Sequence, residues 1–162
     1  LGARPNNQAA LAASADAPSR VLHIAGRRDF GDLAAPSDRY DLRDYVTPFG
    51  NALAAADLCV ARSGGSIFEL AQYGLPAVLV PYPHASADHQ TTNARWMESA
   101  GAAVVIPDAE LTAQRLARCV AELVADRARL GQMAAASRRL ARPDAALDVA
   151  RELLASSKCP TP

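Results

Sequence analysis

Two loops hold the residues of this sequence that could do chemistry, one with two adjacent glycines and one dense in hydrogen-bonding side chains. In the first loop, residues 62–69, Gly64 and Gly65 allow the backbone to approach a ligand closely. Ser66 is placed to cap the helix that follows, and the free amides of a helix start form a site for an anion such as a diphosphate. Ser66 and Glu69 also have the spacing of a capping box, which needs no ligand. On these residues alone both interpretations stay open.

Glu69 lies one turn into that predicted helix, beside the anion site. A carboxylate next to a bound phosphate would repel it, so a role in ligand binding must involve hydroxyl groups. The 2′- and 3′-hydroxyls of a ribose fit, because one carboxylate accepts a hydrogen bond from each. If the first loop binds a ligand, Glu69 therefore points to a nucleotide.

The second loop, residues 81–93, is dense in short acceptors and amide donors. This mixture suits the recognition of sugar hydroxyls, and the side chains that could provide it are Asp88, His89, Gln90 and Asn93. A metal site from His84, Asp88 and His89 is a competing interpretation, but adjacent residues rarely converge on one ion. We therefore expect no metal and no cofactor. A solvated loop in which Asp88 helps to cap the next helix stays open as the alternative without a ligand.

Gly26 is a further candidate, because it follows an apolar run and precedes Arg27 and Arg28. A turn here could bring positive charge to the phosphates, although a surface arginine pair needs no ligand. His23, inside the run, is interpreted as a core histidine with satisfied hydrogen bonds. The sequence has no phosphate loop, no nucleophile elbow and no zinc-protease motif. The residues alone therefore predict a nucleotide-binding domain and no catalytic residue.

The elements that must position these loops alternate along the chain. Five short apolar runs predict strands over residues 21–25, 42–46, 58–61, 77–80 and 102–106. Helices are predicted over residues 52–56, 67–73, 89–100, 113–125, 127–140 and 145–154. Continuous apolar strands separated by helices are typical of a parallel sheet covered on both faces, so we predict a Rossmann-like, doubly wound α/β fold. In such sheets the ligand lies beyond the carboxyl ends of the strands.

Glycine and tryptophan positions refine this prediction. Gly74 and Gly101 stand where helices are expected to end, because glycine readily adopts the left-handed conformation of a helix C-terminus. Trp96 and Met97, on the helix after the second loop, are both expected to pack into the core.

Composition agrees with one globular domain. Half of the 162 residues are apolar, 21% are charged, and the 17 basic residues equal the 17 acidic ones. A net charge of zero argues against a nucleic-acid partner, whose surface requires a basic excess. Three widely spaced cysteines fit a reducing compartment and neither a disulfide framework nor a zinc site. We expect the domain to span residues 1–155, with a disordered tail over residues 156–162.

Order and spacing over residues 45–106 point to one family. The matching segments are Tyr45-Val46, Ala54 to Asp57, Arg62 to Gly64, Glu69-Leu70, Gly74 to Ala77, Val80 to Pro83, Asp88 to Gln90, Asn93-Ala94 and Ala100 to Ala103. Together they resemble the C-terminal domain of the peptidoglycan N-acetylglucosaminyltransferase (MurG) family, the donor-binding half of a GT-B glycosyltransferase. Leu1 to Arg4 resembles the end of that family's glycine-rich loop.

The resemblance implies a set of contacts with a UDP-sugar donor. The backbone of Val46 would read the uracil edge, with Phe49 nearby. For the diphosphate, the implied residues are Gly64, Gly65 and Ser66, with Arg4 and Gly26 beside them. Glu69 would bind the ribose. For the N-acetylglucosamine, they are His89 and Gln90, with Asp88 and Asn93 shaping the loop. The segment between Gly64 and Glu69 is one residue shorter than in many members.

The activity that the resemblance implies is inverting transfer of N-acetylglucosamine from UDP-N-acetylglucosamine to the lipid-linked muramyl-pentapeptide precursor of peptidoglycan. In this family the acceptor site, the membrane contact and the proposed base belong to an N-terminal domain. We therefore expect the first strand and that domain to be missing from this chain, which would bind donor without turning it over. The implied location is the cytoplasmic face of the bacterial inner membrane, where the enzyme is peripheral.

Two other functions stay open from the sequence. One is another UDP-sugar glycosyltransferase of the superfamily, acting on a glycolipid or a natural product. The other is a non-catalytic donor-binding subunit that needs a membrane partner chain, similar to the two-chain N-acetylglucosaminyltransferases of eukaryotes.

Overall fold

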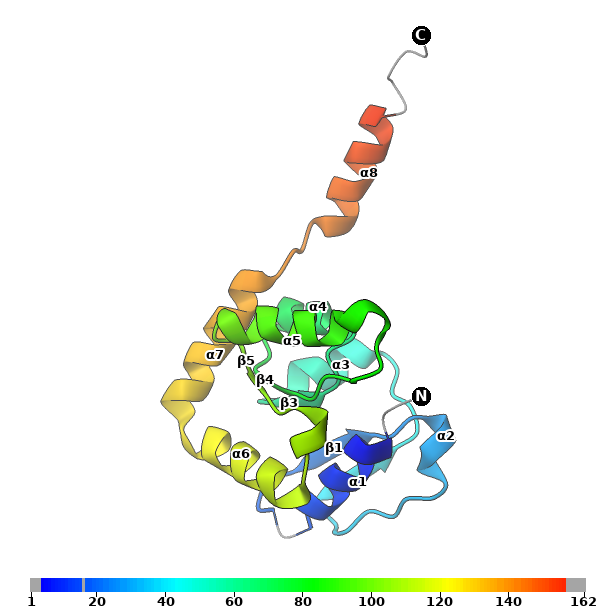
Figure 1. The fold of residues 1–162 in the computed structure, drawn as a ribbon, viewed down its shortest axis with the longest axis vertical. Helices are drawn as coiled ribbons and strands as arrows, with labels where there is room; N and C mark the ends of the chain where they lie inside the picture. The colour runs from blue at the N-terminus through cyan, green and yellow to red at the C-terminus, as the bar shows by residue number, and fades with distance from the viewer. Residues whose placement is uncertain (1–3, 16, 157–162) are drawn as a thin grey trace.

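The structure, a computed structural model, describes residues 4–15 and 17–156 (Figure 1). The predicted tail over residues 156–162 lies outside this part of the chain except for Ser156, which ends a helix. Leu1 to Ala3 also lie outside it, so their resemblance to a glycine-rich loop is not tested.

Among the described residues, five parallel strands form two sheets. In the first sheet, β1 (Val21–Ile24) pairs with β2 (Tyr40–Arg43). In the second, the order is β3 (Cys59–Ala61), β4 (Ala77–Leu79) and β5 (Ala103–Val105). β2 ends before the predicted residues 42–46 are complete. Its register explains this, because Ile24 pairs with Arg43 and the turn at Gly26 then ends its partner strand.

The two sheets are separate, whereas the sequence predicted one. Within the described residues, β1 pairs only with β2, and β3 pairs only with β4. β1 and β3 each carry an exposed apolar side chain, Leu22 at 45% and Val60 at 38%.

Eight α-helices are found among the described residues. They are α1 (Arg4–Ala13), α2 (Arg27–Phe30), α3 (Phe49–Ala55), α4 (Ser66–Tyr73), α5 (His89–Ser99), α6 (Ala113–Ala125), α7 (Arg127–Leu140) and α8 (Ala145–Ser156). Two 3-10 turns, η1 (Ser86–Asp88) and η2 (Asp108–Glu110), precede α5 and α6. α6 and α7 have the predicted bounds because side chains cap both: Thr112 accepts from the Arg115 amide, and Asp126 from the Arg129 amide. α1 and α2 were not predicted.

The core lies on both faces of β4, which is wholly buried. Ala77 and Leu79 face the cluster formed with α4 and α5, and Val78 and Val80 face the cluster formed with α6 and α7. The two layers of helices are visible on opposite sides of β3 to β5 (Figure 1). This arrangement confirms the predicted sheet with helices on both faces.

Trp96 departs from its predicted place in the core. Met97 is fully buried, as expected, but Trp96 is 37% exposed and lies beside Phe68 of α4, with ring centroids 5.7 Å apart. The cause is helical geometry. Ala94 and Met97, three residues apart, face the sheet, so Trp96 projects from a different side of α5.

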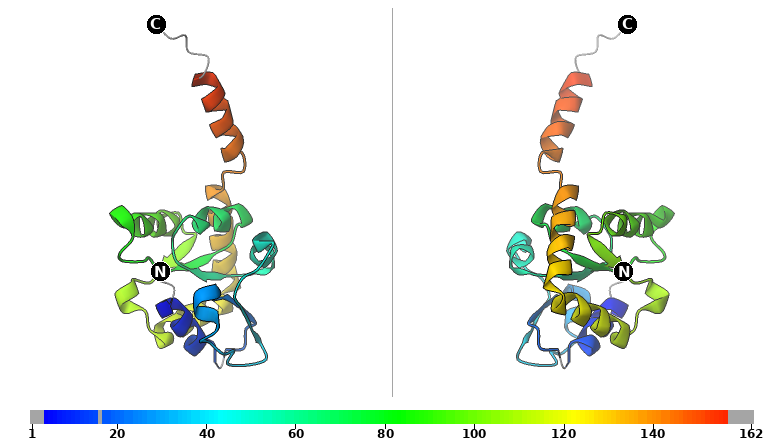
Figure 2. Two further views of the ribbon diagram at one scale, coloured as in Figure 1. Left: turned by 90° about the vertical axis from the view of Figure 1, so that its right-hand side faces the viewer. Right: turned by 90° about the vertical axis from the view of Figure 1, so that its left-hand side faces the viewer.

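α8 extends away from the rest of the molecule (Figure 2). Four of its apolar side chains are at least half exposed: Leu147, Val149, Leu153 and Leu154. None of the described helices is both long and apolar enough to cross a bilayer.

Replacing Gly74 with alanine should destabilise the fold, whereas the same change at Gly131 should not. Gly74 ends α4 at φ 62°, and an added Cβ would lie 2.2 Å from Cγ of Arg138. We expect Gly74→Ala to lower the free energy of unfolding by about 1 kcal/mol or more, measured by urea titration. Gly131, inside α7, has open space around it, so Gly131→Ala should raise that free energy by about 0.5–1 kcal/mol. Equal effects of the two changes would show that neither the left-handed backbone nor the contact with Arg138 matters at Gly74.

Candidate functional site

The two predicted loops meet at the carboxyl edge of the second sheet. Ser63, which follows β3, is fully buried, and its hydroxyl donates to the backbone carbonyl of Gln90 at 2.7 Å. Asn93 of α5 donates through Nδ2 to the Ser63 carbonyl at 2.9 Å. The loop after β3 and the start of α5 are therefore held against each other by two hydrogen bonds.

The start of α4 has no side-chain cap from its N-cap residue. That residue is Gly65, and Ser66 is already helical, so the prediction that Ser66 caps the helix is wrong, and so is the capping box. A serine caps from an extended N-cap position, which the turn through Gly64 and Gly65 does not give it. The amides of Ile67 and Phe68 already donate to the carbonyls of Gly64 and Gly65, both at 3.2 Å. The amides of Gly65 and Ser66 precede them, and no hydrogen bond within the described residues uses either one. An anion could accept hydrogen bonds from them.

Gln90 is fixed in place by its own side chain. Its Oε1 accepts from the backbone amide of Tyr82 at 3.0 Å, so the amide group spans the loop after β4. The Nε2 end lies 3.9 Å from where a Cβ on Gly64 would be. Gln90 thus reaches from the second loop to the glycine of the first, next to the start of α4.

Asp88 begins α5 in an unusual conformation. Ala87 and Asp88 have φ values of 50° and 52°, in the left-handed region that costs a non-glycine residue about 1–2 kcal/mol. The Asp88 carboxylate accepts from the Thr91 hydroxyl at 2.6 Å and caps no backbone amide, so the predicted cap is wrong. Backbone in this region often marks a functional loop.

His89, the next residue, is exposed. Its Nδ1 lies 2.8 Å from the carbonyl oxygen of Ser86. A carbonyl can only accept, so Nδ1 carries a hydrogen, and the tautomer with its one hydrogen on Nδ1 presents Nε2 as an acceptor. An acceptor of this kind suits a sugar hydroxyl.

Positive charge near Gly26 comes from two arginines in different surroundings. Gly26 forms the predicted turn at φ 81°. Arg28 donates to the carboxylate of the buried Asp29 at 2.8 and 3.1 Å, and these bonds hold the pKa of Asp29 below its usual value. Arg27 lies over the ring of Tyr45, at 5.6 Å, a contact that leaves its charge in place. Arg28 is therefore paired already, and a role of Gly26 and Arg27 toward a ligand stays a prediction.

Asn7 of α1 is a structural residue that sequence reasoning missed. It is 5% exposed, and its Nδ2 donates to the Ala25 carbonyl at 3.1 Å and to Asp29 at 3.2 Å. Its Oδ1 lies 3.0 Å from Nε2 of His23, whose Nδ1 lies 2.7 Å from the Tyr40 hydroxyl. Asn7 therefore fixes the end of β1, just before the Gly26 turn. Only its place in the fold shows this, since one asparagine in a helix is no signal.

The remaining predicted contacts stand at the surface. Glu69 is exposed in the first turn of α4, and Phe49 begins α3 at 36% exposure. Val46 lies between β2 and α3, one residue before the cis peptide bond that joins Thr47 and Pro48. Arg4 pairs with Asp32 at 3.2 Å, with both side chains largely exposed. Their roles toward a donor stay predictions.

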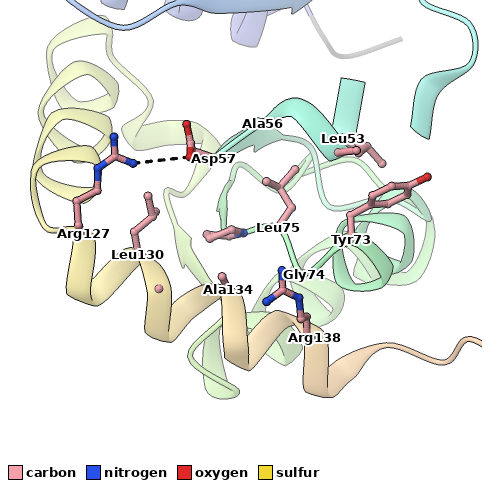
Figure 3. Close-up of a pocket in the computed structure, with 13 residues that line it drawn as sticks. Leu53, Ala56, Asp57, Tyr73, Gly74, Leu75, Arg127, Leu130, Ala134 and Arg138 are labelled. Atoms are coloured by element: carbon pink, nitrogen blue, oxygen red, sulfur yellow. Dashed lines mark ion pairs between the residues drawn. The ribbon is translucent and has the colours of Figure 1, made fainter. Parts of the chain in front are cut away.

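A hollow of about 320 Å³ lies elsewhere, between α7 and the amino ends of β3 and β4 (Figure 3). Leu53, Leu75 and Leu130 line it, and Arg127 faces Asp57 across it at 3.7 Å. In a parallel sheet the amino ends lie opposite the ligand edge, so this hollow does not belong to the candidate site. Within residues 4–15 and 17–156, no three His, Cys, Asp or Glu side chains are grouped as metal ligands would be.

Comparison with known proteins gives consistent matches. Residues 1–149 match the family described as glycosyltransferase family 28 C-terminal domain. A UDP-N-acetylglucosamine–N-acetylmuramyl-(pentapeptide) pyrophosphoryl-undecaprenol N-acetylglucosamine transferase of Rubrobacter xylanophilus is 40% identical over 156 residues, covering 96% of this chain and 46% of the relative. The enzyme of the same name from Alkalilimnicola ehrlichii is 41% identical over 167 residues, covering 98% and 47%. The chain thus spans about half the length of these curated relatives.

Solved structures give the same picture. The structure of Acinetobacter baumannii MurG superposes with a TM-score of 0.82 at 28% identity, covering 94% of this chain and 46% of that one. A calicheamicin glycosyltransferase superposes with a TM-score of 0.70 at 25% identity, covering 95% and 40%. These matches confirm the predicted fold.

His23 should make the stability of the fold depend on pH. Burial lowers the pKa of His23 below its ordinary 6.5, so the unfolded chain takes up the proton first as the pH falls. Protonation of His23 should leave the free energy of unfolding unchanged above about pH 6.5. Below that pH the free energy of unfolding should fall, until the pH reaches the lower pKa that His23 has in the folded state. In urea titrations between pH 8 and 5, we expect the free energy of unfolding to fall less for His23→Gln than for the wild type. Parallel losses in both proteins would contradict this assignment.

Proposed function

The chain belongs to the glycosyltransferase family 28 C-terminal domain family, and from this premise we propose that it is the donor-binding half of a UDP-N-acetylglucosamine transferase of peptidoglycan synthesis. The whole reaction would be inverting transfer of N-acetylglucosamine to the lipid-linked muramyl-pentapeptide precursor. Two curated relatives, matched over almost all of this chain, have names that state this donor and this acceptor.

The observation that carries the proposal is the start of α4. Its N-cap glycine offers its amides no side-chain cap, and the helix begins directly after the close approach of Gly64 to Gln90. Glu69 stands one turn further on, where ribose hydroxyls would lie if the diphosphate is bound at the helix start. His89, with an acceptor at Nε2, and Gln90 lie on the adjoining loop and suit the sugar.

In this proposal the chain assists departure of the nucleotide. An acceptor hydroxyl attacks the anomeric carbon from the face opposite UDP, the bond from that carbon to the diphosphate oxygen breaks, and UDP leaves with the electron pair. The α4 amides would stabilise the charge that develops on the diphosphate, and Arg4 would add to this. The base that takes the hydroxyl proton would come from the part of the relatives that this chain does not match.

In this proposal, the part of the relatives that this chain does not match also binds the acceptor lipid and contacts the membrane surface. The relatives' names include an undecaprenol-linked acceptor, so the enzyme as a whole would work on the cytoplasmic face of the inner membrane. The greater structural similarity to MurG than to the calicheamicin enzyme, TM-scores of 0.82 and 0.70, favours this acceptor class over a natural product.

Calorimetric titration of the chain with UDP-N-acetylglucosamine and with UDP-glucose tests the proposal. We expect the N-acetyl sugar to bind more tightly, and Glu69→Ala to weaken its binding about tenfold or more, because the hydrogen bonds to the ribose are lost. Glu122→Ala, which removes the same charge from the exposed surface of α6, is the matched control and should bind as the wild type does.

Two outcomes would count against the proposal in different ways. Tight binding of UDP-N-acetylglucosamine that is unchanged in Glu69→Ala would contradict the assignment of Glu69 to the ribose, but it would still support donor binding. A folded chain that binds neither UDP-sugar would remove the donor-binding function itself.

A further inference from the structure

Arg62 lies where the carboxyl ends of three strands meet. It directly follows β3, and its side chain is 16% exposed. Nη1 donates to the carbonyls of Val80 at 3.1 Å and Pro81 at 3.2 Å, which follow β4. The same nitrogen donates at 2.5 Å to the carboxylate of Asp108, which begins η2 after β5. One guanidinium therefore ties together the ends of β3, β4 and β5.

Contacts continue from Arg62 to the predicted sugar site. The guanidinium carbon lies 5.4 Å from the centre of the Tyr82 ring. The amide of Tyr82 donates to Oε1 of Gln90 at 3.0 Å, which orients the Gln90 side chain beside Gly64. A series of contacts thus connects Asp108 with Gln90 through Arg62 and Tyr82, although Asp108 itself lies on another strand-end loop.

The surroundings of the pair favour a positioning role. The Asp108 side chain is 26% exposed and that of Arg62 16%, so water screens their attraction only in part. On the same turn η2, Glu110 pairs with Arg115, but those side chains are 50% and 48% exposed. An exposed pair of this kind contributes little to the free energy of folding. Asp108 and Glu110 lie on the same turn and each pairs with an arginine, but only the partner of Asp108 also bonds to the loop after β4. Glu110 is therefore a matched control for Asp108.

We propose that Asp108 is a positioning residue for donor recognition: by holding Arg62 it fixes the loop after β4, and so sets the place of Gln90 against the sugar. This inference rests on the proposed function for its effect on the donor. The holding of the loop by the pair does not depend on any ligand, and it can be measured in the free chain.

The test compares Asp108→Ala, Asp108→Asn and Glu110→Ala in the whole chain. In Asp108→Ala, amide hydrogen exchange of residues 82–90 should speed up about tenfold, because the Tyr82 amide loses its fixed partner more often. The preference for UDP-N-acetylglucosamine over UDP-glucose should fall about three- to tenfold, measured by calorimetry. Asp108→Asn keeps an acceptor for Arg62 and should restore part of both, and Glu110→Ala should match the wild type. Loss of global stability alone would not change a sugar preference.

The outcomes separate this inference from the proposed function. Unchanged exchange over residues 82–90 together with an unchanged sugar preference in Asp108→Ala would overturn it. Equal effects of Asp108→Ala and Glu110→Ala would overturn it too, since the burial of the Arg62 pair would then be irrelevant. If the wild-type chain binds no UDP-sugar, the proposed function fails, and the exchange rates alone decide whether Asp108 holds the loop.

Discussion

Burial of β4 on both faces is the constraint on which the rest of this structure depends. A strand with no exposed side chain must be covered by helices above and below. The chain supplies α4 and α5 on one face and α6 on the other, and α7 packs against both clusters, through Ala136 on the first face and Leu130 and Met133 on the second. α4 follows β3 and α5 follows β4, so each of these helices starts near the carboxyl end of a strand. Because the strands are parallel, the polar loops that lead into α4 and α5 lie at the same edge of the sheet.

The candidate site is held by side chains that bond to backbone groups of other loops. Ser63, Asn93 and Arg62 each reach a main-chain group or partner on another strand-end loop. Such bonds leave few polar groups unsatisfied where Ser63 is buried, and they fix backbone positions more firmly than contacts between flexible side chains would. Exposed groups such as Glu69 and His89 can then meet a ligand from a rigid frame.

Local signals in the sequence were enough for most elements. The apolar run at residues 77–80 predicted the strand that lies between β3 and β5, and the helices predicted over residues 113–125 and 127–140 are confirmed. α1 was missed because its alanine-rich sequence has no apolar period, and Trp96 was misplaced because one residue along a helix turns a side chain by about 100°. Ser66 was predicted to cap α4, but the N-cap residue is Gly65, one position earlier. Contacts between residues far apart, such as Arg62 and Asp108, leave no local pattern to find.

The separation of the two sheets has a consequence for local stability. Within the described part of the chain no strand hydrogen bonds join them, so the half built on β1 and β2 contacts the other half mainly through the packing of α1 on α6. Side-chain packing between two helices joins the halves less strongly than a continuous ladder of hydrogen bonds between strands would. The β1–β2 half should therefore open at a lower free energy than the core around β4, as a separate cooperative unit with its own melting.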